Sequence, residues 1–122
     1  MSDIDRRAHI REYKETRQPA GIFRVRNVAA GKSLIGSARN LPGMLNCQRF
    51  QLKNGLHPDV DLQKDWNELG ADAFEFDVLD RLELPDAPAY DPTDDLRTLK
   101  EMWIERLTES GELLYPRSLS VR

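Results

Sequence analysis

The chain has 122 residues, of which 39% are hydrophobic and 32% are charged, and its formal net charge is −3. This size and composition are typical of one soluble globular domain with its own hydrophobic core, and they argue against a multidomain enzyme. The one cysteine, Cys47, cannot form an internal disulfide, which favours a reducing compartment. No apolar stretch approaches the roughly 18 residues of a membrane span, and residues 1–7 lack the apolar segment of a signal peptide. We therefore expect a cytoplasmic domain without a membrane partner.

The charge is distributed unevenly along the chain. Residues 1–49 hold ten basic and four acidic residues, a net charge of +6, whereas residues 50–122 hold eight basic and 17 acidic residues, a net charge of −9. The two halves either pack together and neutralise each other on a mixed surface, or present a basic face that contacts phosphate. The acidic overall balance is compatible with the second interpretation, because affinity for a polyanion depends on the local patch.

The N-terminal segment is polar. Residues 3–17 are compatible with a helix, which Pro19 would end because a proline disfavours helix in the residue before it. We expect residues 1–20 to form a helical extension ahead of the first strand.

A β-hairpin is expected next. Apolar and charged residues alternate from Phe23 to Arg26, which is the period-two pattern of a strand half exposed to water, over about residues 21–28. A turn that contains Gly31 then leads to a short return strand over residues 33–36.

Two helices are expected after the hairpin. Residues 39–52 have a loosely helical apolar spacing that Pro42 and Gly43 interrupt early. Pro58 suits the first turn of the second helix, and Gly70 stands where a left-handed C-terminal cap is expected. The buried stripe of the second helix is expected to comprise Leu62, Trp66 and Leu69.

A third strand and a last helix complete the domain. Residues 74–82 alternate cleanly, which predicts a strand. Residues 83–92 hold three prolines and are expected to form a stiff connection, after which Asp91 or Thr93 can cap a helix over about residues 94–109. The core-facing residues are expected to be Phe74, Phe76 and Val78 on the strand, and Leu96, Leu99, Trp103 and Leu107 on the helix.

This order of elements predicts an α+β fold, in which a small three-stranded antiparallel sheet is flanked by helices. Residues 21–116 are expected to form the domain, with Tyr115 as the last anchor, and residues 117–122 a short tail.

The hairpin resembles the paired strand motifs of the GIY-YIG nucleases. Residues 21–23 are Gly-Ile-Phe, and after a ten-residue gap residues 34–36 are Leu-Ile-Gly. Further similarity follows in the same order at Asn40-Leu41, His57, residues 62–70, residues 74–79 and Trp103-Ile104. The resemblance spans about residues 21–115 and implies a GIY-YIG-like fold.

The resemblance also implies a metal-dependent phosphodiesterase. In this family the tyrosine of the first motif helps to activate water, while the tyrosine of the second motif and an arginine ten residues later position the phosphate. A glutamate on the last long helix binds a divalent cation, so Mg²⁺ or Mn²⁺ is implied as the cofactor of an active member.

The residues at these four positions have different chemistry in this chain. Phe23 and Leu34 replace the two tyrosines, Met44 replaces the arginine, and Lys100 replaces the glutamate. A lysine cannot bind magnesium, and its charge would repel the ion. Glu101 is one residue away, but one step along a helix rotates a side chain by about 100°.

Two functional hypotheses follow. The first is a catalytically degenerate GIY-YIG-like domain, without a cofactor, that binds nucleic acid or a protein partner. The alternative is an active endonuclease that depends on Mg²⁺ or Mn²⁺ and uses a rearranged site of His57, Glu101 and Tyr115. The replacements leave the question of enzyme activity open and favour the binding domain. A third hypothesis is self-association through a helix over residues 3–17. Its apolar positions are sparse and support this hypothesis only weakly.

Four basic residues are candidates for nucleic-acid contacts: Arg24, Arg26, Lys32 and Arg39. Arginine is suited to this role because its planar guanidinium matches phosphate oxygens. Salt bridges to the acidic face of the third strand, which includes Glu75 and Asp77, explain the same residues equally well.

Other conspicuous residues have structural interpretations. A histidine at the start of a helix, as His57 is expected to be, is more often bonded to a backbone carbonyl than used as a ligand or catalyst. Trp66 and Trp103 fall in apolar stripes, which favours core packing over base stacking. No histidine near Cys47 in the sequence indicates an activated thiol, so we expect a buried, inert one.

Overall fold

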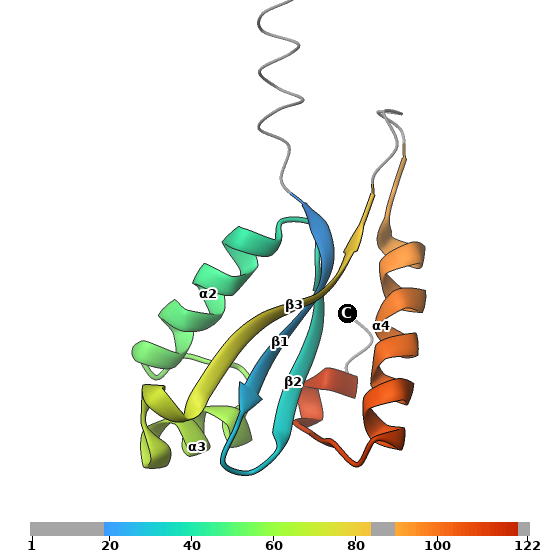
Figure 1. The fold of residues 1–122 in the computed structure, drawn as a ribbon. Helices are drawn as coiled ribbons and strands as arrows, with labels where there is room; N and C mark the ends of the chain where they lie inside the picture. The colour runs from blue at the N-terminus through green and yellow to red at the C-terminus, as the bar shows by residue number, and fades with distance from the viewer. Residues whose placement is uncertain (1–18, 84–89, 120–122) are drawn as a thin grey trace, which may run out of the picture.

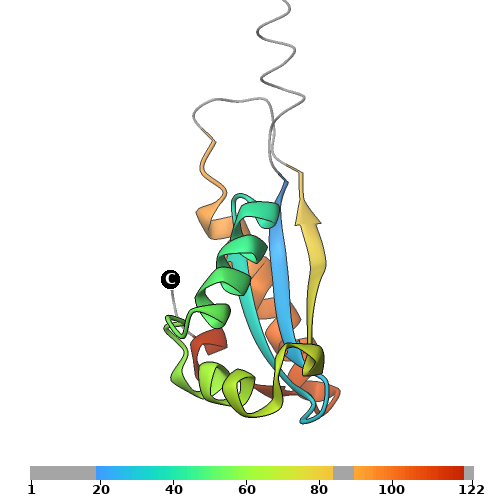
Figure 2. The ribbon, with the colours of Figure 1, turned by 90° about the vertical axis from the view of Figure 1, so that its left-hand side faces the viewer.

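The computed structural model describes residues 19–83 and 90–119 (Figure 1). The helix expected within residues 1–20 lies outside these residues. In the described part of the chain, a four-stranded sheet has helices α2 and α3 over one face and α4 over the other. Figure 2 looks onto α2 and α3, with the strands and α4 behind them. None of the described helices has the length and apolar character needed to cross a membrane.

Strands β1 (Ala20–Asn27) and β2 (Lys32–Ala38) form the predicted antiparallel hairpin. Gly31 in the connecting turn has a φ of 62°, a left-handed conformation that glycine adopts without steric cost. Phe23 lies opposite Gly36, and a Cβ atom at Gly36 would come within 2.4 Å of the Phe23 ring. The phenyl ring therefore crosses the neighbouring strand at a position where only glycine fits.

Helix α2 (Leu41–Lys53) is continuous, so the expected interruption at Pro42 and Gly43 is wrong. These two residues lie in the first turn, where a proline has no hydrogen bond to lose. The side chain of Asn40 caps the helix, since its Oδ1 accepts from the backbone N–H of Gly43 at 3.0 Å.

Helix α3 (Val60–Leu69) begins after Pro58 rather than at it, because Asp59 is the N-cap and accepts from the backbone N–H of Leu62. Leu62 and Trp66 are buried as predicted. Leu69 is 49% exposed, contrary to the prediction, because it is the last residue of the helix and extends past the core. A short 3-10 helix, η1 (Ala71–Ala73), leads into the next strand.

Strand β3 (Phe74–Leu82) pairs antiparallel with β1, as predicted. Phe74 is buried and Phe76 is partly buried, but Val78 is 38% exposed, contrary to the prediction. The pairing register shifts at this place, since Phe23 lies opposite Val78 whereas Ile22 lies opposite Asp80. The resulting bulge disturbs the regular alternation on which the prediction relied.

Helix α4 (Thr93–Glu109) matches the predicted range closely. The expected cap at Asp91 or Thr93 is wrong, because the N-cap is Pro92 and no side chain makes a capping hydrogen bond. Oδ1 of Asp91 accepts from the backbone N–H of Thr93, the first residue of the helix, at 3.0 Å. Leu96 is buried, and Trp103 is half-buried with its Nε1–H donated to Oδ2 of Asp80 at 3.0 Å. The helix is thus fastened to β3 by an indole hydrogen bond as well as by apolar packing.

The C-terminal segment adds a fourth strand, so the prediction of a three-stranded antiparallel sheet is wrong in this detail. Strand β4 (Leu113–Leu114) runs parallel to β2, which makes the sheet mixed, with the order β3-β1-β2-β4. A two-residue strand is too short to produce a periodic pattern in the sequence. A 3-10 helix, η2 (Pro116–Leu119), follows. Its Ser118 is fully buried and accepts from the backbone N–H of Ile35, so the packed structure continues past residue 116.

A hydrophobic cluster of buried residues lies on the face of the sheet that α2 and α3 cover. Trp66 packs against Phe74 with a ring-centroid separation of 5.2 Å, which confirms the core role predicted for this tryptophan. The cluster comprises Phe23, Val25, Leu34, Ala38, Leu41, Leu52, Leu62, Trp66, Phe74 and Tyr115.

Candidate functional site

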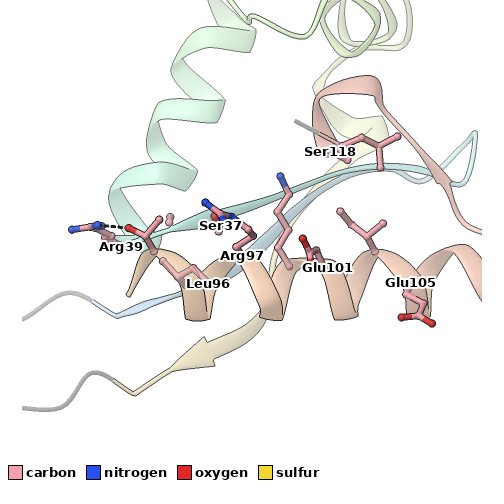
Figure 3. A pocket seen from close by; sticks show the side chains of 12 residues that line it. Ser37, Arg39, Leu96, Arg97, Glu101, Glu105 and Ser118 are labelled. Carbon is pink, nitrogen blue, oxygen red and sulfur yellow. Dashed lines mark hydrogen bonds between the residues drawn. The ribbon is translucent and has the colours of Figure 1, made fainter. Parts of the chain in front are cut away.

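A pocket of about 450 Å³ lies between α4, the end of β2 and η2 (Figure 3). Its lining combines three cations, two carboxylates, three hydroxyl groups and four apolar side chains. These are Arg39, Arg97, Lys100, Glu101, Glu105, Ser37, Thr93, Ser118, Ala38, Leu96, Ile104 and Leu119.

Helix α4 supplies most of this lining through its periodicity. Residues three and four positions apart lie on the same side of a helix, which brings Arg97, Lys100, Glu101 and Ile104 onto the wall of one pocket. The opposite wall comes from β2 and from η2, which the hydrogen bond between Ser118 and the backbone of β2 holds in place.

Arg39 and Arg97 form ion pairs near the start of α4. Nη2 of Arg39 lies 2.6 Å from Oδ1 of Asp91 and also donates to Oγ1 of Thr93 at 2.7 Å. Hydrogen bonds from the hydroxyl and the backbone N–H of Thr93 lower the pKa of Asp91, with a smaller contribution from Arg39. Arg97 pairs with Asp94 at 3.7 Å. The side chains of both pairs are largely exposed to solvent.

Lys100 is the buried cation of the pocket, with 8% of its surface exposed. Burial lowers the pKa of its ammonium group, because removal from water disfavours the charged form. It lies one turn after Arg97 on the same helix, so the two cations line the same pocket.

The other three positions that match the family's catalytic residues lie in or against the core. Phe23 and Leu34 are buried within the hydrophobic cluster, and Met44 packs against it. The Met44 sulfur accepts a hydrogen bond from Nε2 of Gln48 at 3.5 Å. The structure thus gives three of the four positions apolar surroundings, while Lys100 lines the pocket.

His57 is buried within a network of side chains rather than bonded to a backbone carbonyl. The backbone N–H of Asp59 donates to Nδ1 of His57 at 3.0 Å, so the ring proton is on Nε2 and is donated to Oε1 of Gln48 at 2.5 Å. Burial lowers the pKa of His57 and outweighs the opposite effect of Asp59. These contacts hold a neutral imidazole between α2 and the start of α3.

Tyr115 is fully buried in the core. Its hydroxyl donates to Oδ2 of Asp65 at 2.7 Å and accepts from Nδ2 of Asn27 at 3.2 Å. Burial, followed by the hydrogen bond to Asp65, raises the pKa of Tyr115 well above its ordinary value.

Glu101 lines the pocket, whereas His57 and Tyr115 do not. Among residues 19–83 and 90–119, no group of three or more His, Cys, Asp or Glu side chains is arranged to hold a metal ion.

The four candidate nucleic-acid contacts each touch a neighbouring side chain. Arg24 pairs with Asp77 at 3.0 Å, which is the predicted type of salt bridge to the third strand. Arg26 instead pairs with Glu112 at 3.2 Å, a partner that the sequence did not suggest because the C-terminal segment must first fold beside β2. The ammonium group of Lys32 lies 4.7 Å from the centre of the Tyr115 ring. Of the four, Arg39 alone lines the pocket.

Cys47 is exposed, so the expectation of a buried thiol is wrong. The buried residues of α2 are Leu41, Gln48 and Leu52, which recur at helical spacing and define the side that faces the core. Cys47 lies outside that stripe, and the loose apolar pattern of this helix did not reveal which side was buried.

Sequence reasoning missed Arg97 and the residues of η2 as parts of a site. The i to i+3 spacing of Arg97 and Lys100 was a usable signal, because it places both residues on one helical face. Ser118 and Leu119 carried no comparable signal, since they reach the pocket only through the packing of η2.

The arrangement of the hairpin, the helices and β3 is a GIY-YIG-like fold, as predicted. Two solved structures that resemble this chain are of the catalytic domain of I-TevI, which is named as an intron endonuclease and as a homing endonuclease. A point mutant of that domain aligns with a TM-score of 0.63 and 22% identity over 80% of this chain and 92% of that domain. A second structure aligns with a TM-score of 0.60 and 24% identity over 77% of this chain and 94% of that domain. No protein-family model matches the sequence, and no curated protein is significantly similar to it.

Proposed function

We propose that this chain is a nucleic-acid-binding domain that has the GIY-YIG fold and has lost phosphodiester hydrolysis. The observation that carries the proposal is the chemistry of the four matched positions, Phe23, Leu34, Met44 and Lys100. None of these side chains can serve as a carboxylate ligand for a divalent cation, and three of them carry no group that positions a phosphate.

The loss of these groups has a large expected effect on rate. Removing one group that stabilises the charge of a transition state commonly costs about 100-fold or more. Here all four replacements fall at positions of the same catalytic site, and the cation Lys100 stands where the family has a metal ligand. Hydrolysis by the family mechanism is therefore not expected of this chain.

Two features support nucleic acid as the ligand. Two solved structures with a similar fold are of the catalytic domain of an endonuclease. In addition, Arg39, Arg97 and Lys100 line an open pocket, and such groups suit phosphate oxygens.

The test is an assay of binding and cleavage on branched and duplex DNA, with and without Mg²⁺ or Mn²⁺. We expect binding that weakens as salt rises, because phosphate contacts release counterions, and no cutting under any condition. The variant Lys100→Glu restores a carboxylate at one position and is also expected not to cut, because the other three groups stay absent.

Metal-dependent cutting by the unmodified chain would overturn the proposal and favour an active endonuclease with a rearranged site. Absence of both cutting and binding would also overturn it, and would direct the search to a protein partner.

A further inference from the structure

The pocket beside α4 is divided by charge along its length. Arg39 and Arg97 lie near the start of α4, whereas Glu105 lies at the far end of the pocket (Figure 3). On α4, Lys100 lies between Arg97 and Glu105 in sequence order. The cations are therefore concentrated toward one end, which suits a ligand with an anionic group at that end.

The present partners of the two arginines leave them available to a ligand. Both ion pairs, Arg39 with Asp91 and Arg97 with Asp94, are made by exposed side chains. Exposed ion pairs contribute little to stability, because water already solvates both charges. An anion that enters the pocket can therefore replace these carboxylates at small cost.

Lys100 gives the pocket a cation that is already removed from water. Desolvation of the ammonium group is a large part of the free-energy cost of binding an anion through a lysine. Because Lys100 is already buried, that desolvation occurs on folding rather than on binding. An anionic group beside this ammonium also favours its charged form, opposing the effect of burial.

The rest of the lining suits an apolar body. Leu96, Ile104 and Leu119 supply apolar surface, and the volume of about 450 Å³ lies in the range of small-molecule sites. A phosphate joined to a sugar and a base has this combination, because the base is flat and its two faces pack on apolar surface.

We propose that this pocket binds one nucleotide, with its phosphate held directly by Arg39, Arg97 and Lys100 and without a divalent cation. The proposal rests on the proposed function and names the site that performs it. The same chemistry belongs to a free nucleotide and to a nucleotide within a strand, so the experiment includes both.

The experiment measures the binding of a fluorescent single-stranded oligodeoxynucleotide by anisotropy in the presence of EDTA. We expect binding to persist in EDTA and to weaken about tenfold or more in Arg97→Ala, because a hydrogen bond to a charged group is lost. Lys53→Ala is the matched control, since it removes one exposed charge from α2, and it is expected to change the affinity by about twofold or less. Circular dichroism spectra of both variants check that each is folded.

A second pair of variants tests whether removing negative charge from the pocket strengthens binding. Glu101→Gln removes a carboxylate from the pocket wall and is expected to strengthen binding, whereas Glu68→Gln, which removes a carboxylate from α3, is expected to leave it unchanged. Deoxyadenosine monophosphate, titrated into the protein without the oligonucleotide, is expected to shift the amide resonances of pocket residues.

The outcomes separate this proposal from the proposed function. Equal binding by Arg97→Ala and Lys53→Ala, or binding that EDTA abolishes, would overturn the pocket assignment while nucleic-acid binding itself stands. Resonance shifts with the mononucleotide but no binding of the strand would support the pocket as a site for free nucleotide and overturn the proposed function.

Discussion

Gly36 shows how one residue accommodates a large neighbour. A Cβ atom at this position would lie 2.4 Å from the Phe23 ring, much closer than van der Waals contact. We expect Gly36→Ala to destabilise the domain by about 1–3 kcal/mol, because overpacking forces the ring or the strand to move. Urea denaturation measures the change, and the added variant Phe23→Leu should recover part of the loss. An unchanged free energy of unfolding in Gly36→Ala would contradict this account.

His57 links the stability of the domain to pH. Burial lowers the pKa of the folded state below the ordinary value of 6.5, so the unfolded chain binds more protons in the range just below pH 6.5. The contribution of His57 is therefore complete above pH 6.5 and is lost as the pH falls through the range down to the folded-state pKa. We expect the melting temperature to fall on acidification with a steeper slope than in His57→Asn, which cannot titrate. Equal slopes from pH 8 to pH 5 would show that His57 is not responsible.

At the scale of elements, η2 holds the C-terminal segment to the hairpin through Ser118. Its hydroxyl accepts from the backbone N–H of Ile35 at 2.9 Å and donates to the carbonyl of Ser33 at 3.2 Å. We expect Ser118→Ala to cost about 1–3 kcal/mol, because a buried N–H loses its partner. Ser110→Ala removes a hydroxyl that bonds the exposed end of α4, and it serves as the control with a smaller expected loss. Equal losses in denaturant midpoints would indicate that η2 is not part of the cooperative unit.

The elements with a strong period were predicted well, and those that depend on tertiary contacts were not. The hairpin, β3 and α4 have clear alternation or helical spacing, and the structure reproduces them to within a few residues. Pro42 was misread as an interruption because the Asn40 cap, which places it in the first turn of α2, depends on local geometry. Strand β4 leaves no signal in the sequence, because its two residues become a strand only by pairing with the edge of β2.

The candidate site divides in the same way. Lys100 was located from its spacing to Ile104 and from the resemblance, and the structure places it in a pocket. The surroundings of Arg26 could not be foreseen, since its partner Glu112 is 86 positions away along the chain and reaches it only through β4. The chemistry of each candidate side chain could therefore be predicted from the sequence. The residue that each one contacts could be identified only from the folded structure.

At the scale of the whole molecule, ion pairs among the described residues neutralise part of the uneven charge of the sequence. Arg24 pairs with Asp77, and Arg26 pairs with Glu112, so basic residues of the first half contact acids of the second half. The number of phosphates contacted should accordingly be small. If the three pocket cations carry binding to single-stranded DNA, the slope of log K against log salt is expected to be about −2. A slope steeper than about −4 would indicate that the whole basic half is used, and Arg24→Ala would then weaken binding strongly.

The exposure of Cys47 has a practical consequence for such measurements. It is the only cysteine in the chain, and it lies on α2, across the sheet from α4 and the pocket. A maleimide dye can therefore be attached at one defined place without any substitution in the protein and without covering the lining of the pocket. The native sequence thus offers a ready labelling position for single-molecule fluorescence, with the distance from α2 to a dye on an oligonucleotide reporting where the strand lies.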